Sequence, residues 1–147
     1  MPDFDVIICG LGPVGAIAAN VLGQEGHKVL VVEQNNGGGL KPRAGGFDDE
    51  NQRLLQSVGL GDAFQRTSNN MNMGLDPGGP ATTPCRNGLG YGYRGFYQPR
   101  FEAILREGLE RFPNVTTRLS TRCVGVTQTP SSAVVTLQRD SGTWRRT

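Results

Sequence analysis

A glycine pattern near the start of the chain, G-x-G-x-x-G over residues 10–15, constrains its fold more than any other feature. The pattern directly follows a short apolar run, residues 6–9, and it precedes apolar residues at helical spacing up to Leu22. A second apolar run covers residues 29–32. Short, continuously apolar runs are typical of strands in a parallel sheet, and strand, helix and strand within about 30 residues form a βαβ unit. The sequence therefore predicts an α/β fold with a central parallel sheet.

Each glycine of the pattern has a mechanical role in binding a dinucleotide. Gly10 permits a tight turn, Gly12 removes a side chain so that the backbone can approach a pyrophosphate, and Gly15 lets the helix pack closely on the strand. Pro13 suits the first helical turn, and the free N–H groups at a helix N-terminus attract phosphate. The pattern predicts a Rossmann-like FAD/NAD(P)-binding domain, and a glycine-rich turn in another α/β fold is the alternative.

An acidic residue stands where such a domain contacts ribose. Glu33 follows the second apolar run, 18 residues after Gly15, and its carboxylate can accept hydrogen bonds from ribose hydroxyls. A carboxylate at this position disfavours a ribose 2′-phosphate. The sequence thus favours FAD or NAD over NADP as the dinucleotide of this site.

Capping and turn signals organise the middle of the chain. Asp48 is a suitable N-cap for a helix that runs through Val58 and ends at Gly59. Apolar residues at helical spacing predict another helix over residues 99–112. Because Gly and Pro are frequent between these helices, residues 67–95 are expected to form an irregular segment.

Strand signals end the chain. Segments near residues 115–129, 133–138 and 143–147 predict a C-terminal β-meander. The last segment begins a hairpin strand where the sequence stops, which would leave an unprotected sheet edge. We therefore expect residues 1–147 to be one domain, the incomplete N-terminal portion of a truncated longer protein.

Charge and cysteine usage disfavour several classes of function. The formal net charge is +2 with no block of like charge, which argues against binding nucleic acid or a membrane surface. No apolar run is long enough to cross a bilayer. The three cysteines have no C-x-x-C spacing, so we expect no metal site, no disulfide framework and a cytoplasmic protein. Cys9, inside the first apolar run, is interpreted as a small buried hydrophobe.

A series of motifs continues the glycine pattern along the chain. They are Pro-Arg-Ala-Gly-Gly over residues 42–46, Asp-Asp-Glu over 48–50, Leu-Leu-Gln-Ser-Val-Gly-Leu over 54–60, Phe-Tyr-Gln-Pro over 96–99 and Arg-Phe-Pro-Asn-Val over 111–115. Together with Asp5 and Ile8, they resemble FAD-dependent aromatic-ring hydroxylases of the para-hydroxybenzoate hydroxylase type. The branch most similar hydroxylates 3-hydroxyphenylpropionate and related phenols. The resemblance covers nearly the whole chain except residues 67–95.

The resemblance assigns cofactor-binding roles to matching positions. Glu33 would hold the adenosine ribose of FAD, and Val124 would meet the adenine through its backbone. Arg43 would reach the pyrophosphate or the nicotinamide cofactor, since a guanidinium is a suitable fork for phosphate. Gln98 would contact the flavin side of FAD. The remaining residues of the expected FAD site are Gly10, Gly12, Pro13, Val14, Gly15 and Gln34. A solvated surface arginine at position 43 and a simple helix cap at position 98 are the alternatives.

The resemblance also implies an activity for the full-length protein. That protein would be an FAD-dependent monooxygenase that hydroxylates a small aromatic or phenolic substrate with dioxygen and NADH or NADPH. Residues 1–147 would be part of its FAD-binding domain, with catalytic residues beyond Thr147 and little activity in the isolated chain. The alternatives are another FAD- or NAD-linked oxidoreductase, such as a dehydrogenase or halogenase, and a non-catalytic dinucleotide-binding fragment.

Overall fold

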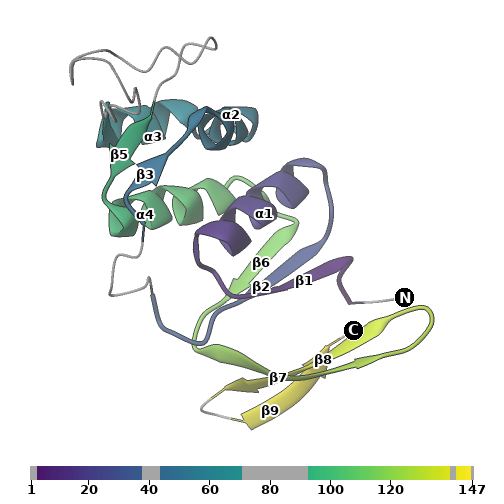
Figure 1. Ribbon diagram of the computed structural model, residues 1–147. Coiled ribbons are helices and arrows are strands. Elements are labelled where there is room, and N and C mark those ends of the chain that lie inside the picture. The colour runs from purple at the N-terminus through teal and green to yellow at the C-terminus, as the bar shows by residue number, and fades with distance from the viewer. Residues whose placement is uncertain (1–2, 38–43, 71–92, 140–141, 147) are drawn as a thin grey trace, which may run out of the picture. The chain divides into compact units, whose positions relative to one another are not determined.

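The computed structural model describes residues 3–37, 44–70, 93–139 and 142–146 (Figure 1). By its internal contacts the chain divides into two compact units. The first unit comprises Met1–Gly39 and Leu105–Thr147, and the second comprises Leu40–Ile104.

The first unit contains the predicted parallel sheet, with the strand order β1-β2-β6. Strand β1 is Val6–Cys9, β2 is Val29–Val32 and β6 is Val115–Arg118. Helix α1, Pro13–Gln24, connects β1 to β2, so the predicted βαβ unit is confirmed (Figure 1). All four residues of β2 are buried, as a central strand covered on both faces requires.

The strand predicted near residues 115–129 is two strands that belong to different sheets. Strand β6 pairs with β2 in parallel, whereas β7, Thr121–Gln128, begins a separate antiparallel sheet. Ser120 lies between them with a φ of +49°, in the left-handed region where a sharp change of direction is possible. The antiparallel sheet continues through β8, Ala133–Arg139, and β9, Gly142–Arg146, which confirms the predicted β-meander.

The core of the first unit lies between its two sheets. Leu30 and Val32 of β2 pack with Val135 and Leu137 of β8, and all four are buried. Phe4, Ile7 and Cys123 are partly buried against this cluster. The meander therefore covers one face of β2, and this packing brings β7 to the parallel sheet.

A fully buried amide joins α1 to the end of helix α4, which is Gln98–Leu109. The Asn20 side chain donates to the carbonyl oxygens of Ala16 at 2.8 Å and Leu105 at 2.9 Å. Its oxygen accepts from the Arg111 guanidinium at 3.2 Å. Because both the nitrogen and the oxygen of the Asn20 amide have hydrogen-bond partners, this polar side chain can be buried without a large energetic cost.

The second unit has a core of phenylalanines. Phe47, Phe64, Phe96 and Phe101 lie with ring centroids between 4.8 and 5.9 Å apart. Such edge-to-face and offset pairs are favourable beyond the apolar area that they bury. These rings belong to α3, Gly61–Thr67, to α4, and to an antiparallel sheet with the strand order β3-β5-β4. These strands are Gly46–Phe47, Arg94–Phe96 and Ser68–Asn70 respectively.

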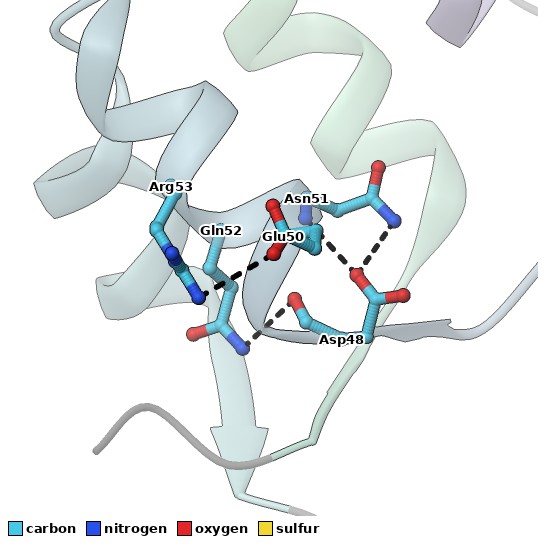
Figure 2. Close-up of polar contacts among 5 residues, drawn as sticks. All are labelled: Asp48, Glu50, Asn51, Gln52 and Arg53. Atoms are coloured by element: carbon cyan, nitrogen blue, oxygen red, sulfur yellow. Dashed lines mark hydrogen bonds and ion pairs between the residues drawn. The ribbon is translucent and has the colours of Figure 1, made fainter. Parts of the chain in front are cut away.

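The predicted cap of the second unit's first helix is confirmed (Figure 2). Helix α2, Asp49–Ser57, begins after Asp48, whose carboxylate accepts from the Asn51 backbone at 3.0 Å and side chain at 2.9 Å. The Gln52 amide donates to the Asp48 carbonyl oxygen at 3.3 Å. An Arg53–Glu50 ion pair at 3.5 Å lies beside them. These contacts account for Asp48 and Glu50, whereas Asp49 is buried and its carboxylate oxygens have no hydrogen-bond partner among the described residues.

Two boundaries differ from prediction. The segment expected to be irregular, residues 67–95, begins with the last residue of α3 and with β4, and it ends inside β5. Its middle, residues 71–92, lies outside the described residues. The helix predicted over 99–112 starts one residue earlier and ends at Leu109. In the part of the chain that is described, no helix has the length and apolar character needed to span a membrane.

Candidate functional site

The glycine turn joins β1 to α1 at the ends of the parallel strands. Gly10 has a φ of +112°, a conformation that side-chain-bearing residues rarely adopt, and its N–H donates to the Val32 carbonyl oxygen at 2.7 Å. The first glycine of the pattern therefore has the predicted role of permitting a tight turn, and it is held against the end of β2.

The other two glycines differ in what surrounds them. A Cβ atom at Gly15 would overlap the Gly10 carbonyl oxygen and lie 3.2 Å from Ile8 Cγ2, so α1 packs on the turn as predicted. A Cβ atom at Gly12 would meet nothing within 4 Å. The space at Gly12 is thus open on the side where a ligand would approach.

The N-terminus of α1 has no side-chain partner among the described residues. Gly12 is the N-cap residue, Pro13 follows it, and neither a side-chain cap nor an acidic residue lies in the first turn. The N–H groups of that turn and the positive end of the helix dipole therefore face outward uncompensated. Val14, in the same turn, is 84% exposed.

Glu33 connects β2 to the glycine turn. Its Oε2 accepts from the Leu11 N–H at 3.0 Å, and its Oε1 accepts from the Asn35 backbone at 2.9 Å and side chain at 2.8 Å. Partial burial raises the pKa of Glu33, but these hydrogen bonds and the charge of Arg106 outweigh it, so the pKa is lowered from its ordinary value. Glu33 is therefore ionised at neutral pH.

A cavity of about 240 Å³ lies beside Glu33. Its wall combines the ends of β1 and β2 with the start of β7, and it is lined by Cys9, Gly10, Val32, Glu33, Gln34, Thr121, Arg122 and Cys123. Three of these residues, Gly10, Glu33 and Gln34, are predicted site residues. The cavity thus brings Gly10 of the glycine turn, Glu33 and Arg122 to one concave surface.

Sequence reasoning named one residue of β7, Val124, and missed the three residues of β7 that line the cavity. Thr121, Arg122 and Cys123 line the cavity because the Thr121 N–H donates to the Glu33 carbonyl oxygen at 2.8 Å. Val124, predicted to meet the adenine through its backbone, is 47% exposed and lies at a β-bulge between Cys123 and Gly125, next to the lining residue Cys123.

The interpretation of Cys9 as a buried hydrophobe is wrong. Cys9 is exposed and lines the cavity, because it is the last residue of β1, at the edge of the described sheet. An apolar run predicts a strand, but it does not predict whether the last residue of that strand is buried by neighbouring elements.

Two other predicted site residues, Gln98 and Arg43, belong to the second unit. Gln98 is buried in the second unit, where its oxygen accepts from the Ala44 N–H at 3.0 Å and its amide donates to Glu102 at 2.8 Å. Arg43 lies outside the described residues. The structure thus assembles the glycine turn, Glu33 and Gln34, and it places Gln98 in a separate polar cluster.

Comparison with known proteins gives matches over nearly the whole chain. A family model described as an FAD binding domain matches residues 3–146. The chain is 37% identical over 144 residues to a 3-(3-hydroxy-phenyl)propionate/3-hydroxycinnamic acid hydroxylase of Paraburkholderia xenovorans, and 38% identical over 143 residues to one of Escherichia coli. These matches cover 94% and 93% of this chain but 23% and 26% of the relatives. The chain spans about a quarter of the length of these curated relatives.

Solved structures match the fold. The flavin-dependent monooxygenase PieE aligns with a TM-score of 0.83 at 20% identity, over 99% of this chain and 29% of PieE. Aklavinone-11 hydroxylase aligns with a TM-score of 0.81 at 23% identity, over 99% of this chain and 31% of that protein. The predicted Rossmann-like α/β fold is confirmed.

Because Gly15 is tightly packed and Gly12 is not, adding one methyl group should affect stability much more at Gly15 than at Gly12. Gly15→Ala should lower the free energy of unfolding by about 1–3 kcal/mol, because α1 must move away from the Gly10 carbonyl oxygen. Gly12→Ala, the matched control, should change it by less than about 1 kcal/mol, since the new methyl group meets open space. Urea unfolding followed by circular dichroism measures both, and equal losses would contradict the packing described.

The hydrogen bonds of Glu33 predict a pH-dependent contribution to stability. Because folding lowers its pKa, the charged carboxylate stabilises the fold above the ordinary value of 4.5, and this contribution is lost as the pH falls through the lowered value. Glu33→Gln should therefore unfold at lower urea concentration than the parent at neutral pH, with the difference shrinking in acid. Glu110→Gln, at an exposed site, is the control. A difference for Glu33→Gln that stays constant with pH would refute the assignment.

Proposed function

This chain belongs to the FAD-binding domain family, and from that premise we propose that its first unit binds FAD through the glycine turn and the Glu33 cavity. The observation that carries the proposal is the open space at Gly12, directly before an uncapped helix N-terminus. A pyrophosphate supplies the negative charge that such a terminus lacks.

The turn fits a pyrophosphate without a basic side chain. The α1 N–H groups would donate to the phosphate oxygens, and the helix dipole would favour their charge. Pro13, as the first helical residue, offers no N–H itself but fixes the backbone from which the next donors project. Val14, exposed in the same turn, would cover the ligand with an apolar side chain.

The Glu33 cavity fits the adenosine half of FAD. A carboxylate has about four acceptor sites, and three are taken by Leu11 and Asn35, so one ribose hydroxyl can be accommodated before a protein donor must leave. Gln34 would add a polar contact from the same wall. The ionised carboxylate repels a 2′-phosphate, so FAD is favoured over NADP here.

The second unit would serve the same cofactor through Arg43 and Gln98. The Gln98 oxygen holds the Ala44 N–H, so Gln98 fixes the residue directly after Arg43. We propose that Gln98 positions the Arg43 segment in addition to facing the flavin, and that Arg43 meets the pyrophosphate or the nicotinamide cofactor. Both roles derive from family resemblance, and the Ala44 contact supports the positioning part.

We further propose that the protein acts in the hydroxylation of a small phenolic compound. The support is the similarity to 3-(3-hydroxy-phenyl)propionate/3-hydroxycinnamic acid hydroxylases at 37–38% identity. FAD, when bound, supplies the redox chemistry with NADH or NADPH and dioxygen as co-substrates. The described residues would bind and orient the cofactor.

Cofactor binding is tested by titrating the chain with FAD, NAD and NADP and following flavin fluorescence or heat. We expect FAD to bind more tightly than the other two. Gly12→Val should retain the circular dichroism of the parent and lose at least about tenfold in FAD affinity, a difference of about 1.4 kcal/mol, because its side chain fills the space of the pyrophosphate. Tighter NAD binding would favour a different oxidoreductase, and unchanged FAD binding by Gly12→Val would remove the site assignment.

The reaction is tested by NADH and NADPH oxidation with and without 3-hydroxyphenylpropionate, using the chain and a longer protein that contains it. We expect the phenol to accelerate oxidation only in the longer, FAD-loaded protein, with a hydroxylated product detected by mass spectrometry. A flavin-loaded protein that no phenol stimulates would exclude the hydroxylase function while leaving FAD binding intact.

A further inference from the structure

Two thiols meet at the wall of the Glu33 cavity. Cys9 ends β1 and Cys123 lies in β7, and both line the cavity together with Gly10. Both are free cysteines; Cys9 is exposed and Cys123 is half-buried. Residues 114 positions apart in the chain are thus brought to one small surface by the packing of the meander on the parallel sheet.

Besides lining the same cavity, the two side chains lie near enough for Cys123 to affect the ionisation of Cys9. Partial burial, and then the hydrogen bond to Cys123 and its charge, raise the pKa of the Cys9 thiol to about 11. Cys9 therefore keeps its proton at neutral pH, where oxidants attack it slowly, because the thiolate is the reactive form. Access to the cavity, more than thiol acidity, would then decide whether this pair reacts.

We propose that Cys9 and Cys123 form a reversible disulfide across the cavity when it holds no cofactor, and that this disulfide prevents the adenosine half of FAD from binding. The blocking part rests on the function proposed above. The thiol pair would make cofactor loading sensitive to oxidants.

The oxidation balances with hydrogen peroxide as the oxidant. Peroxide converts one thiol to a sulfenic acid and releases one water molecule. The other sulfur attacks the sulfenic sulfur, the S–O bond breaks as the S–S bond forms, and a second water molecule leaves with the remaining protons. A dithiol reductant restores both thiols by disulfide exchange.

The disulfide would act on the cavity through Gly10. A disulfide requires the two Cα atoms to lie within about 7 Å, and its S–S bond is shorter than any hydrogen bond between thiols. Forming it draws the end of β1 toward β7 and moves Gly10, the next residue, with it. Conversely, an adenosine group in the cavity would cover both sulfurs and slow their oxidation.

The test uses the full chain with Cys85→Ser, which leaves Cys9 and Cys123 as its only cysteines. The reduced protein is treated with hydrogen peroxide with and without saturating FAD. Tryptic peptides are analysed by mass spectrometry, and FAD affinity is measured before and after oxidation. We expect an intramolecular Cys9–Cys123 link, slowed about tenfold or more by FAD, and about tenfold weaker FAD binding after oxidation that dithiothreitol reverses.

Single variants provide the controls. Cys9→Ser and Cys123→Ser, each in the Cys85→Ser background, cannot form the link, so peroxide should leave their FAD affinity unchanged. Absence of the link, an intermolecular link instead, or a link with unchanged FAD affinity would each overturn the inference. If the reduced protein binds no FAD, both the proposed function and this inference are wrong. If the reduced protein binds FAD but oxidation gives none of the expected results, only this inference is wrong.

Discussion

The first unit depends on hydrogen bonds that Glu33, directly after β2, makes with three other segments. The backbone N–H of Glu33 donates to the Arg118 carbonyl oxygen at 2.9 Å, and the Glu33 carbonyl oxygen accepts from the Thr121 N–H at 2.8 Å. Its carboxylate accepts from Leu11 at 3.0 Å in the glycine turn. Glu33 thus contacts the glycine turn, the end of β6 and the start of β7, and the cavity lies between the turn, the end of β2 and the start of β7.

The parts of the site that sequence predicts are those set by local backbone constraints. Gly10 has a positive φ, and Gly15 packs against the carbonyl group of Gly10. A side chain is therefore unfavourable at both positions because of neighbours that are close in the sequence. The Asp48 cap is local in the same sense. The cavity wall formed by Thr121, Arg122 and Cys123 is not set by local constraints. It depends on where the chain turns away from the parallel sheet after β6, and on the packing of Leu137 of β8 against Leu30 of β2.

Sequence reasoning also missed helix α3 and the lining role of Cys123. Helix α3 has no side-chain cap at Leu60 and only seven residues, so neither a start signal nor an apolar period marks it. The bulge at Val124, between Cys123 and Gly125, shifts the register of β7 against β8, so strand alternation does not predict that Cys123 lines the cavity. Strand alternation predicts faces only where the pairing is regular.

The unmet N–H groups at the start of α1 have a thermodynamic consequence. A helix whose N-cap is a glycine is less stable than one with a capping side chain by roughly a few tenths of a kcal/mol. A phosphate-bearing ligand that completes this cap stabilises the folded chain by mass action, so that its resistance to heat rises with the supply of ligand. If the proposed ligand binds there, folding and ligand uptake are linked through a single turn of helix.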